Sequence, residues 1–379
     1  MDKQSPILIT GALGFIGKNL TAHLTNQGYT NLLLFDIAYS ENPEQELATF
    51  AKEAKFVFHL AGINRPQSNE AFYSGNRDST TELLELLSKF GNKAPVLLSS
   101  STQATLDNDY GKSKAQAEQA VYSHSSTNGS PVYVFRLPGV FGKWCRPNYN
   151  SVVATFCHNI ASGLPIEVRD PAYSLPLVYI DDVVRCFTDA MEGKVAQDRS
   201  TQPVCLVNPV YQTTLGKLAE LISSFRQSRT TLAVPNMADE FEKKLYSTYL
   251  SYIPSTHFSY NLKMNCDNRG SFTEFLRTPD RGQVSINISK PGVVKGNHWH
   301  HTKNEKFLVV KGEAIIRFRQ IGTSMVTEYR VSDKILQVVD IPTGYTHNIE
   351  NVGKEDLITV MWANEPFDPE NPDTFFEMV

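Results

Sequence analysis

A short apolar strand followed at once by a glycine-rich turn limits the possible folds more than any other feature of this sequence. Residues 7–9 form the expected strand, and residues 18–27 have the spacing of an amphipathic helix. Backbone N–H groups in such a turn, together with the helix N-terminus, can receive a pyrophosphate. Asp36 ends the next expected strand, where a carboxylate can hold the hydroxyls of an adenosine ribose. The expected cofactor contacts in the turn are Gly11, Gly14, Phe15, Ile16 and Gly17.

A tyrosine and a lysine follow a run of three serines further along this half of the chain. Tyr110 and Lys114 are four residues apart and share one face of an expected helix. An ammonium group beside a phenol stabilises the phenolate and lowers the pKa of the phenol, so that it can exchange a proton near neutral pH. Such a tyrosine is a general acid for reducing a ketone or a general base for oxidising an alcohol. A serine hydroxyl of residues 99–101, at a strand end, can hydrogen-bond the carbonyl oxygen.

The G-x-x-G-x-x-G turn, the serines and the Y-x-x-x-K pair together resemble the extended short-chain dehydrogenases, which mostly act on nucleotide sugars. The resemblance implies a Rossmann-type doubly wound parallel sheet. It assigns the catalytic hydroxyl to Ser101, with Ser100 as the alternative, and makes Asn76 a structural asparagine. It also implies cofactor contacts from Ala61, Gly62, Tyr110, Lys114 and Pro138.

A loop of mixed chemistry, residues 143–150, follows the segment that this resemblance places beside the nicotinamide. Its basic, amide and aromatic groups suit a uridine diphosphate, with cations for the phosphates and a ring for the base. Its composition fits a surface loop without a ligand equally well. The substrate-binding candidates are Arg136, Lys143, Arg146 and Asn148.

Three histidines within four positions, followed by a glutamate, characterise the second half of the chain. His298 and His300 alternate, so on a β-strand both imidazoles point to one face. Glu305 follows a short turn, and His347 lies in a later proline- and glycine-containing segment. Three neutral imidazoles and one carboxylate suit a catalytic Zn²⁺ or another divalent first-row metal.

The spacing G-x5-H-x-H-x4-E-x6-G, followed by P-x-G-x2-H-x3-N, resembles the two motifs of the cupins, which are small double-sheet β-barrels. Alternation with period two in residues 284–288 and 314–319 is typical of antiparallel strands, and residues 334–341 are expected to form another. The second motif departs at Leu336, where the cupins have glycine. The alternatives are a solvated histidine-rich turn and a cupin without its metal.

Residues 267–274 and 290–298 resemble the 4-keto sugar epimerases of the deoxyrhamnose pathway, which are also cupins. A metal there can polarise the C4 ketone and stabilise an enolate, while a nearby base removes the C3 proton. Lys295 and His301 are the catalytic candidates, Glu274 and Tyr345 are alternatives, and the sequence does not choose among them.

Over nearly its whole length the chain resembles the CapF family of bifunctional capsular polysaccharide enzymes and its O-antigen relatives. The resemblance implies a zinc-containing cupin that epimerises C3 of UDP-2-acetamido-2,6-dideoxy-4-hexulose. It further implies reduction of C4 with NADPH to UDP-N-acetyl-6-deoxy-L-talosamine, a precursor of UDP-N-acetyl-L-fucosamine, in a homodimer. Asp36 departs from this expectation, because a carboxylate repels a 2′-phosphate and favours NADH. NADPH remains the expected cofactor on the whole-chain match, with NADH as the alternative.

A chain of 379 residues is too long for one ordinary core. We expect a dehydrogenase domain over residues 1–243, with cofactor binding in about 1–130 and a substrate lobe in about 131–236, and a cupin domain over 244–379. The net charge of −4 argues against nucleic acid as a partner, and no apolar run reaches the roughly 20 residues of a membrane span. Five cysteines without metal spacing and a polar opening segment favour a cytoplasmic enzyme. The alternatives are a reductase whose cupin only captures substrate or mediates dimerisation, and a non-enzymatic NAD-binding regulator.

Overall fold

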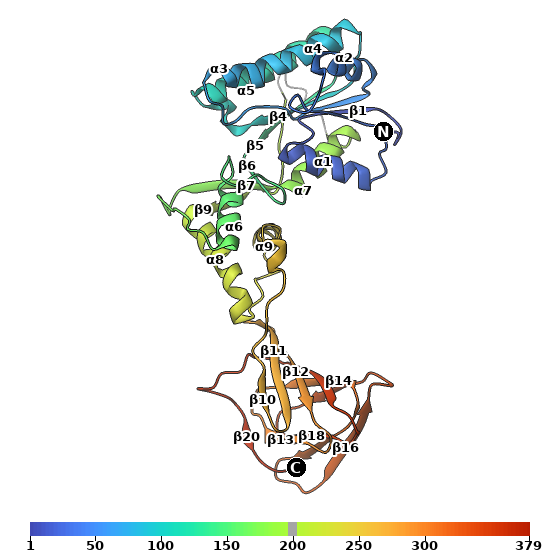
Figure 1. Cartoon of the computed structure of the whole chain (residues 1–379), viewed down its shortest axis with the longest axis vertical. Helices are drawn as coiled ribbons and strands as arrows, with labels where there is room; N and C mark the ends of the chain where they lie inside the picture. Colours follow the sequence, from blue (N-terminus) through green and yellow to red (C-terminus); the bar gives the residue numbers. More distant parts are fainter. Residues whose placement is uncertain (196–202) are drawn as a thin grey trace. The chain divides into compact units, whose positions relative to one another are not determined.

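The computed structural model describes residues 1–195 and 203–379, and its chain forms two compact units (Figure 1). The first unit contains residues 1–223 and 240–254, and the second contains residues 224–239 and 255–379. Helix α8 (Leu215–Thr231) therefore begins in the first unit and ends in the second. The boundary expected between residues 243 and 244 falls inside helix α9 (Glu240–Leu250) and stays a prediction.

Six parallel strands form the central sheet of the first unit in the order β2-β1-β3-β4-β5-β8. Their bounds are β1 (Ile7–Thr10), β2 (Leu32–Phe35), β3 (Phe56–His59), β4 (Val96–Ser101), β5 (Val132–Leu137) and β8 (Val204–Cys205). The strand order reverses at β1, because β2 and β3 lie on opposite sides of it. Ligands of open α/β sheets bind beyond the carboxyl ends of the strands at such a reversal. The predicted Rossmann-type sheet is confirmed.

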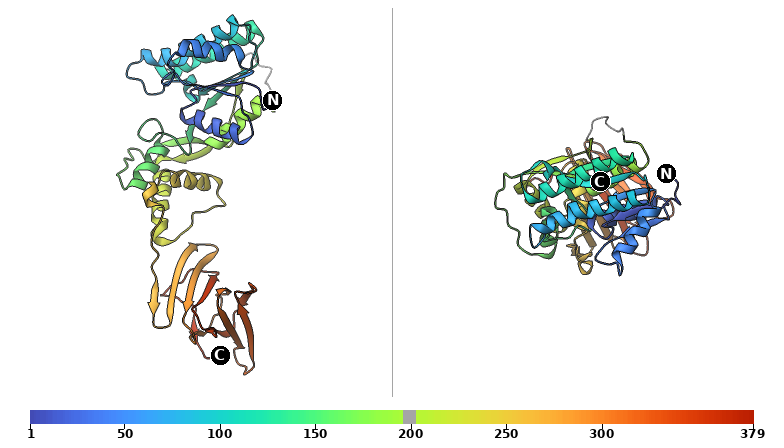
Figure 2. Two further views of the ribbon diagram at one scale, coloured as in Figure 1. Left: turned by 45° about the vertical axis from the view of Figure 1, so that its right-hand side comes forward. Right: turned by 90° about the horizontal axis from the view of Figure 1, so that it is seen from above.

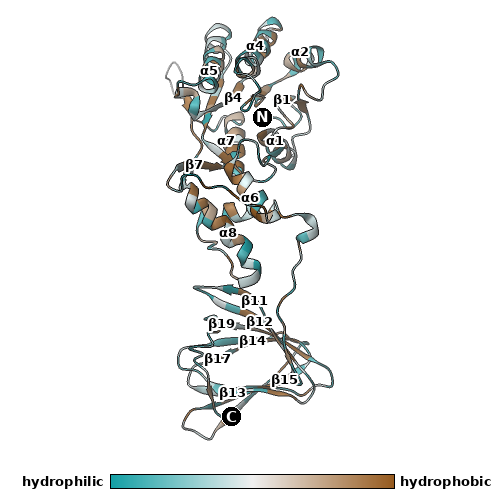
Figure 3. Ribbon diagram, turned by 60° about the vertical axis from the view of Figure 1, so that its left-hand side comes forward, coloured by the Kyte–Doolittle hydropathy of each residue, from teal (hydrophilic) through white to brown (hydrophobic). Residues whose placement is uncertain are grey.

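Helices cover both faces of this sheet (Figures 1 and 2). The helices of one face are α1 (Phe15–Asn26) and α7 (Ile180–Met191), and those of the other are α2 (Pro43–Glu53), α4 (Ser79–Lys89) and α5 (Asp109–Asn128). Strand β1 shows why both layers form: Ile7 and Ile9 join the core under α1 and α7, while Leu8 joins the core under α2, α4 and α5. The change between hydrophobic and hydrophilic residues along α7 can be followed in Figure 3.

The remaining elements of the first unit carry its loops and a small second sheet. The helical segments are α3 (Glu70–Phe72), the π-helix η1 (Tyr73–Asp78), the 3₁₀-helix η2 (Thr102–Thr105) and α6 (Val152–Ser162). The small sheet has the order β6-β7-β9, with β6 (Gly139–Phe141), β7 (Ser174–Tyr179) and β9 (Tyr211–Thr214). Among the described residues, no helix is long and apolar enough to cross a membrane.

Two antiparallel sheets form the second unit, in the orders β10-β11-β12-β19-β14-β17 and β16-β15-β18-β13-β20. The first sheet contains β10 (Asn265–Asp267), β11 (Gly270–Thr278), β12 (Gly282–Ser289), β14 (Glu305–Lys311), β17 (Val338–Ile341) and β19 (Leu357–Ala363). The second contains β13 (Val294–Trp299), β15 (Glu313–Gln320), β16 (Val326–Ser332), β18 (Tyr345–Asn351) and β20 (Phe375–Phe376), and the 3₁₀-helix η3 (Ser255–His257) precedes both. This double-sheet barrel confirms the predicted cupin fold.

One strand prediction needs correction. The strand expected over 334–341 begins only at Val338, and Leu336 is exposed. Residues 333 and 334 form a turn directly after β16, where the Asp333 carboxylate accepts a hydrogen bond from the backbone N–H of Gly312. Ile335 then makes an isolated bridge back to Ser332, so it is not part of β17.

The interior of the barrel is apolar in one part and polar in another. Alternate residues of neighbouring strands, including Phe307, Ile316 and Ile349, form the apolar core between the sheets. Asn287 and Thr359, by contrast, are polar residues buried inside the same barrel. The polar part leaves room for a cavity, which the next section describes.

Candidate active sites

The glycine-rich turn of the first unit is packed too tightly for side chains. A Cβ atom on Gly11, whose φ is +66°, would lie 2.8 Å from the backbone nitrogen of Ala61, and one on Gly17 would lie 2.3 Å from the carbonyl oxygen of Gly11. Gly14 precedes helix α1 and makes no side-chain cap, while Phe15 opens the helix. The free N–H groups at this helix end suit a pyrophosphate, so the residues fit a dinucleotide.

Asp36 lies beside this turn, immediately after β2. Its carboxylate accepts hydrogen bonds from the backbone N–H groups of Leu13, at 3.3 Å, and Ala38, at 3.4 Å. The side chain is thus held next to the glycine turn, where an adenosine ribose would lie. The cofactor contacts themselves, including those expected from Ile16 and Pro138, stay predictions.

Ser101, Tyr110 and Lys114 come together at the carboxyl end of β4. Ser101 ends that strand, and its hydroxyl is hydrogen-bonded to the phenol of Tyr110 in helix α5. Lys114, one helical turn further on, is 7% exposed, and its ammonium donates to the carbonyl oxygen of Ser99 at 3.2 Å. A Cβ atom on Gly62 would lie 3.0 Å from the Lys114 nitrogen. The predicted triad and the loop after β3 therefore meet at one edge of the sheet.

The electrostatics of this triad differ from the expectation. Burial raises the pKa of Tyr110, and the hydrogen bond with Ser101 offsets part of that rise. Burial lowers the pKa of Lys114 to about 8, against the opposing effect of the Glu118 carboxylate. The net lowering of the Tyr110 pKa expected from the sequence is wrong, because burial of the phenol dominates.

Glu118 is a residue that the sequence reasoning missed. It lies one further turn along α5 and is 3% exposed. It accepts hydrogen bonds from the Ser100 hydroxyl at 2.5 Å and from the Arg136 guanidinium at 2.6 and 3.0 Å. Ser100 therefore faces this buried carboxylate, whereas Ser101 faces Tyr110. Arg136 is thus paired with Glu118, and the substrate contact expected of it stays a prediction. The sequence contained one signal for Glu118: it lies four residues after Lys114, and residues four apart on a helix share a face.

Two further buried residues support the loop that follows β3. The ring nitrogens of His59 are hydrogen-bonded to the hydroxyls of Thr10, at 2.7 Å, and Thr80, at 3.0 Å. Burial, with a smaller effect of Lys114, lowers the pKa of His59 to about 3, so its ring is neutral. Asn76 accepts from the backbone N–H of Ile63 at 3.0 Å and donates to its carbonyl oxygen at 2.9 Å. The structural role expected for Asn76 matches these contacts.

The candidate substrate loop between β6 and α6 presents polar groups at the surface. Lys143 donates to Asp181 at 2.7 Å, and the guanidinium of Arg146 lies 5.2 Å from the centre of the Tyr149 ring. Asn148 has a positive φ of 55°. These contacts hold the loop in shape, and its contact with a substrate stays a prediction.

Four residues of the second unit converge inside the barrel. The possible ligand atoms of His298, His300, Glu305 and His347 lie within 4.8 Å of one another. His298 in β13 is paired in register with His347 in β18, and Glu305 begins β14. The Glu305 carboxylate lies 3.5 Å from Nε2 of His300 and 3.3 Å from Nε2 of His347. All four line a cavity of about 490 Å³.

The chemistry of these four side chains fits a metal. Nε2 of His300, Oε2 of Glu305 and both ring nitrogens of His347 are buried and have no hydrogen-bond partner among the described residues. Buried polar atoms are nearly always paired, and a divalent cation bound to three imidazoles and a carboxylate would satisfy all of these atoms except one of the two ring nitrogens of His347. Burial lowers the pKa of His298 to about 4. Burial acts to raise the pKa of Glu305, but His300 and His347 bring it well below its usual range. The two residues are thus in the protonation states that bind metal.

The candidate proton-transfer residues are placed differently. Lys295 lines the cavity, and its ammonium donates to Asn287 Oδ1 at 2.8 Å and to the Ile288 carbonyl at 2.9 Å. Glu274 also lines the cavity. His301 is exposed and lies outside the cavity, with its ring against Trp299 and Phe375. The alternative Tyr345 is also outside it, packed against the apolar core.

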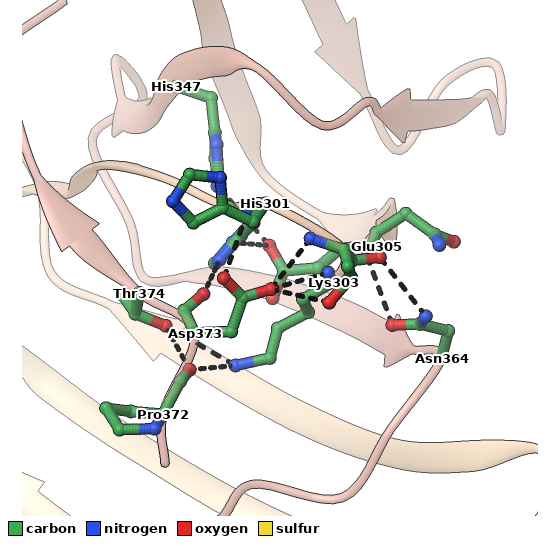
Figure 4. A network of polar contacts seen from close by, with 11 residues as sticks. His301, Lys303, Glu305, His347, Asn364, Pro372, Asp373 and Thr374 are labelled. Carbon is green, nitrogen blue, oxygen red and sulfur yellow. Dashed lines mark hydrogen bonds and ion pairs between the residues drawn. The ribbon is translucent and has the colours of Figure 1, made fainter.

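A polar network beside the four residues was not anticipated from the sequence (Figure 4). It centres on Asp373, whose carbonyl oxygen lies 2.6 Å from Nδ1 of His300. Lys303, 5% exposed, donates to the Pro372 carbonyl at 2.7 Å. No local pattern in the sequence connects residues so far apart along the chain.

Comparison with known proteins defines the class of this chain. Residues 7–202 match the NAD dependent epimerase/dehydratase family, and residues 265–375 match the polysaccharide biosynthesis C-terminal domain. A UDP-glucose 4-epimerase from Thermotoga maritima, 20% identical with a TM-score of 0.55 over 65% of this chain and 98% of that one, shares the fold. The chain is thus a dehydrogenase-type unit joined to a polysaccharide biosynthesis domain.

Full-length relatives identify the family. The chain is 46% identical over 369 residues to the UDP-2-acetamido-2,6-beta-L-arabino-hexul-4-ose reductase of Pseudomonas aeruginosa, covering 97% of each. It is 52% identical to the capsular polysaccharide assembling protein CapF of Staphylococcus aureus, with a TM-score of 0.90 over 98% of this chain and 100% of that one. It is 47% identical to CapF with the inhibitor 3-isopropenyl-tropolone, with a TM-score of 0.87 over 99% of this chain and 100% of that one. The chain belongs to the CapF family.

Proposed function

We propose that the chain is a bifunctional nucleotide-sugar enzyme. Its barrel epimerises C3 of UDP-2-acetamido-2,6-dideoxy-4-hexulose, and its dehydrogenase unit then reduces the C4 ketone to give UDP-N-acetyl-6-deoxy-L-talosamine, a precursor of UDP-N-acetyl-L-fucosamine. Membership of the family makes the chain a reductase of nucleotide sugars, because its Pseudomonas relative is a reductase of a UDP-linked 4-keto sugar. We further propose that it acts as a homodimer.

The triad of the first unit has the groups that ketone reduction needs. Burial keeps the phenol of Tyr110 protonated, so it can donate its proton to the C4 oxygen as the alcohol forms. The Ser101 hydroxyl, hydrogen-bonded to the phenol, can hold the same oxygen. A reduced nicotinamide supplies the hydride when bound. The Lys114 ammonium, charged below about pH 8, stabilises the phenolate that remains.

The proposed reductant is NADPH, and NADH is the alternative. The Asp36 carboxylate is held beside the glycine turn by two backbone N–H groups. A 2′-phosphate at that position would meet a negative charge, whereas the two hydroxyls of NADH would meet an acceptor. The proposal of NADPH rests on the family resemblance, and the structure around Asp36 favours the alternative.

The observation that carries the epimerase half is the convergence of buried donor atoms without partners in the barrel. We assign His298, His300, Glu305 and His347 as ligands of Zn²⁺. When bound, the metal polarises the C4 ketone of the substrate and so acidifies the C3 proton.

Lys295 is the proposed group for proton exchange at C3, because it lines the cavity and His301 does not. Burial lowers the pKa of Lys295, although Asp267 acts in the opposite direction. The lowered pKa increases the fraction of neutral amine that can accept a proton.

The second candidate is a reductase whose barrel only captures substrate or mediates dimerisation. The buried polar atoms of His300, Glu305 and His347 around a cavity argue against it, because unpaired buried polar atoms cost about 1–3 kcal/mol each. A barrel used only for contact between chains would gain from apolar residues at these positions.

The test compares two histidine variants, His298→Ala in the cluster and His301→Ala outside the cavity. Each protein is assayed for zinc content, for deuterium uptake at C3 of the UDP-4-keto sugar without nicotinamide, and for reduction with NADPH or NADH. We expect His298→Ala to lose zinc and C3 exchange but to keep reduction of the C3-epimerised 4-keto sugar when that compound is supplied directly. His301→Ala should keep zinc and C3 exchange, and its loss of exchange with zinc retained would make His301 the base. Exchange that survives without metal in His298→Ala would disprove the proposed role of the zinc site.

A further inference from the structure

A short segment, residues 372–376, runs beside the proposed metal ligands. Its strand β20 pairs with β13, placing Phe376 opposite His298 and Phe375 opposite Trp299. Asp373, just before β20, has a φ of 36°. A non-glycine residue in the left-handed region is strained and persists where surrounding contacts fix it. The contacts that fix Asp373 all lead to the metal-ligand candidates and their connecting turn (Figure 4).

The backbone carbonyl of Asp373 determines which ring nitrogen of His300 is free. It lies 2.6 Å from Nδ1 of His300, and a carbonyl oxygen can only accept. Nδ1 of His300 therefore carries a hydrogen, which leaves Nε2 as the ring nitrogen that can bind a metal. Nε2 is the atom that lies 3.5 Å from the Glu305 carboxylate, inside the cluster. Carbonyl groups in this position orient metal-binding histidines in many proteins.

The carboxylate of Asp373 holds the turn that joins two of the ligands. It accepts hydrogen bonds from the backbone N–H groups of His301 at 2.9 Å, Thr302 at 2.9 Å and Lys303 at 2.8 Å. These three residues lie between His300 and Glu305 in the sequence. One side chain thus fixes the conformation of the turn that connects His300 to Glu305. Lys303 completes the attachment, because its ammonium donates back to the Pro372 carbonyl at 2.7 Å.

We propose that Asp373 is a positioning residue for the metal centre. Its carbonyl selects the His300 tautomer that presents Nε2 to the metal, and its carboxylate sets the spacing between His300 and Glu305. The inference rests on the proposed zinc site. It adds that zinc affinity depends on a residue that is not itself a ligand.

The experiment measures zinc affinity of the full-length protein by competition with a chromophoric chelator. The variants are Asp373→Ala, which removes all the carboxylate contacts, and Asp373→Asn, which keeps the shape and one acceptor oxygen. Asp333→Ala is the matched control, because Asp333 accepts a backbone N–H from Gly312 at a turn that contains none of the four ligands. Long-range ¹H–¹⁵N spectra of the zinc-free proteins report the His300 tautomer, and His300→Gln identifies its signals.

We expect Asp373→Ala to weaken zinc binding by about 10- to 100-fold, the range found for outer-shell partners of metal ligands. Asp373→Asn should lose less, and Asp333→Ala should bind as the wild type does. Asp373→Ala keeps the backbone carbonyl but loses the carboxylate that holds residue 373 against the turn beside His300. The zinc-free variant should therefore show a mixture of His300 tautomers, whereas the wild type shows Nδ1–H alone.

Zinc affinity of Asp373→Ala within about twofold of the wild type, or an equal loss in Asp333→Ala, would overturn the positioning role. If Asp373→Ala does not fold, the same criterion applies to Asp373→Asn. A wild type that fails to bind zinc would instead disprove the proposed site, so the two failures are distinguishable.

Discussion

Replacing Arg136 with methionine is expected to destabilise the first unit more than replacing both Arg136 and Glu118. The two side chains form a pair inside the unit, with the Glu118 side chain 4% exposed and that of Arg136 30% exposed. Arg136→Met would leave a buried carboxylate without its cation. Removing one partner of a buried pair costs about 3–5 kcal/mol.

The reverse change should cost less because the remaining charge can reach water. Glu118→Gln leaves a guanidinium that is partly exposed, so we expect a loss of about 1–2 kcal/mol, below the range for fully buried pairs. The variant with both substitutions leaves no unpaired charge, and the glutamine introduced in place of Glu118 can still accept from the Ser100 hydroxyl. We expect this double variant to lose about 1–2 kcal/mol, which corresponds to a coupling of roughly 3–5 kcal/mol between the two sites.

The assay is urea-dependent hydrogen exchange read on peptides from β4, α5 and β5. Peptide resolution is needed because a chain with two compact units need not unfold in one transition. Additive effects of the two substitutions would refute the reasoning. A raised KM for the nucleotide sugar in Arg136→Met, with unchanged stability, would support the substrate role expected for Arg136 from the sequence.

Three further predictions concern the reductase site. Asp36→Ala should raise the ratio of kcat/KM with NADPH to that with NADH, because a charge that repels a 2′-phosphate is removed; an unchanged ratio would show that Asp36 does not contact the ribose. Tyr110→Phe should lower the rate of reduction by roughly 10²–10⁴-fold and leave C3 exchange intact, and loss of both activities would contradict separate sites. In the wild type, kcat/KM for reduction should fall above about pH 8, because burial lowers the pKa of Lys114 to about 8 and the ammonium charge is lost above it. Lys114→Arg, which stays charged, should remove that decline, and a decline that persists belongs to another group.

Features encoded by local spacing were predictable from the sequence. The glycine turn follows β1 because close packing against Ala61 excludes side chains, and this requirement appears directly as glycines. The convergence of His298, His300 and Glu305 was predictable because strand alternation and one short turn place them. Both folds were implied by the resemblance of these motifs to known families, and period-two alternation in residues 284–288 and 314–319 added support for the antiparallel sheets.

Features that depend on burial or on distant residues were not predictable. The pKa of Tyr110 is raised because the fold buries the phenol, and no local spacing reports burial depth. Lys295 and His301 are both near the metal-ligand candidates in sequence, but a side chain reaches the cavity only from the inner face of the barrel. Asp373 contacts His300 across 73 residues of chain.

The chemistry of the proposed reactions fixes their order. A proton at C3 can be exchanged because the neighbouring ketone at C4 receives the charge, and a metal held by His298, His300, Glu305 and His347 would strengthen that effect. Addition of a hydride to C4 and of the Tyr110 proton to its oxygen converts this ketone into an alcohol, which cannot stabilise a carbanion. Epimerisation must therefore precede reduction. The 4-hydroxy product, incubated with zinc-loaded enzyme in deuterium oxide without nicotinamide, should take up no deuterium at C3, whereas the 4-keto substrate should. Uptake by the alcohol would mean that the barrel removes the proton without using the ketone, and the proposed role of the metal would fail with it.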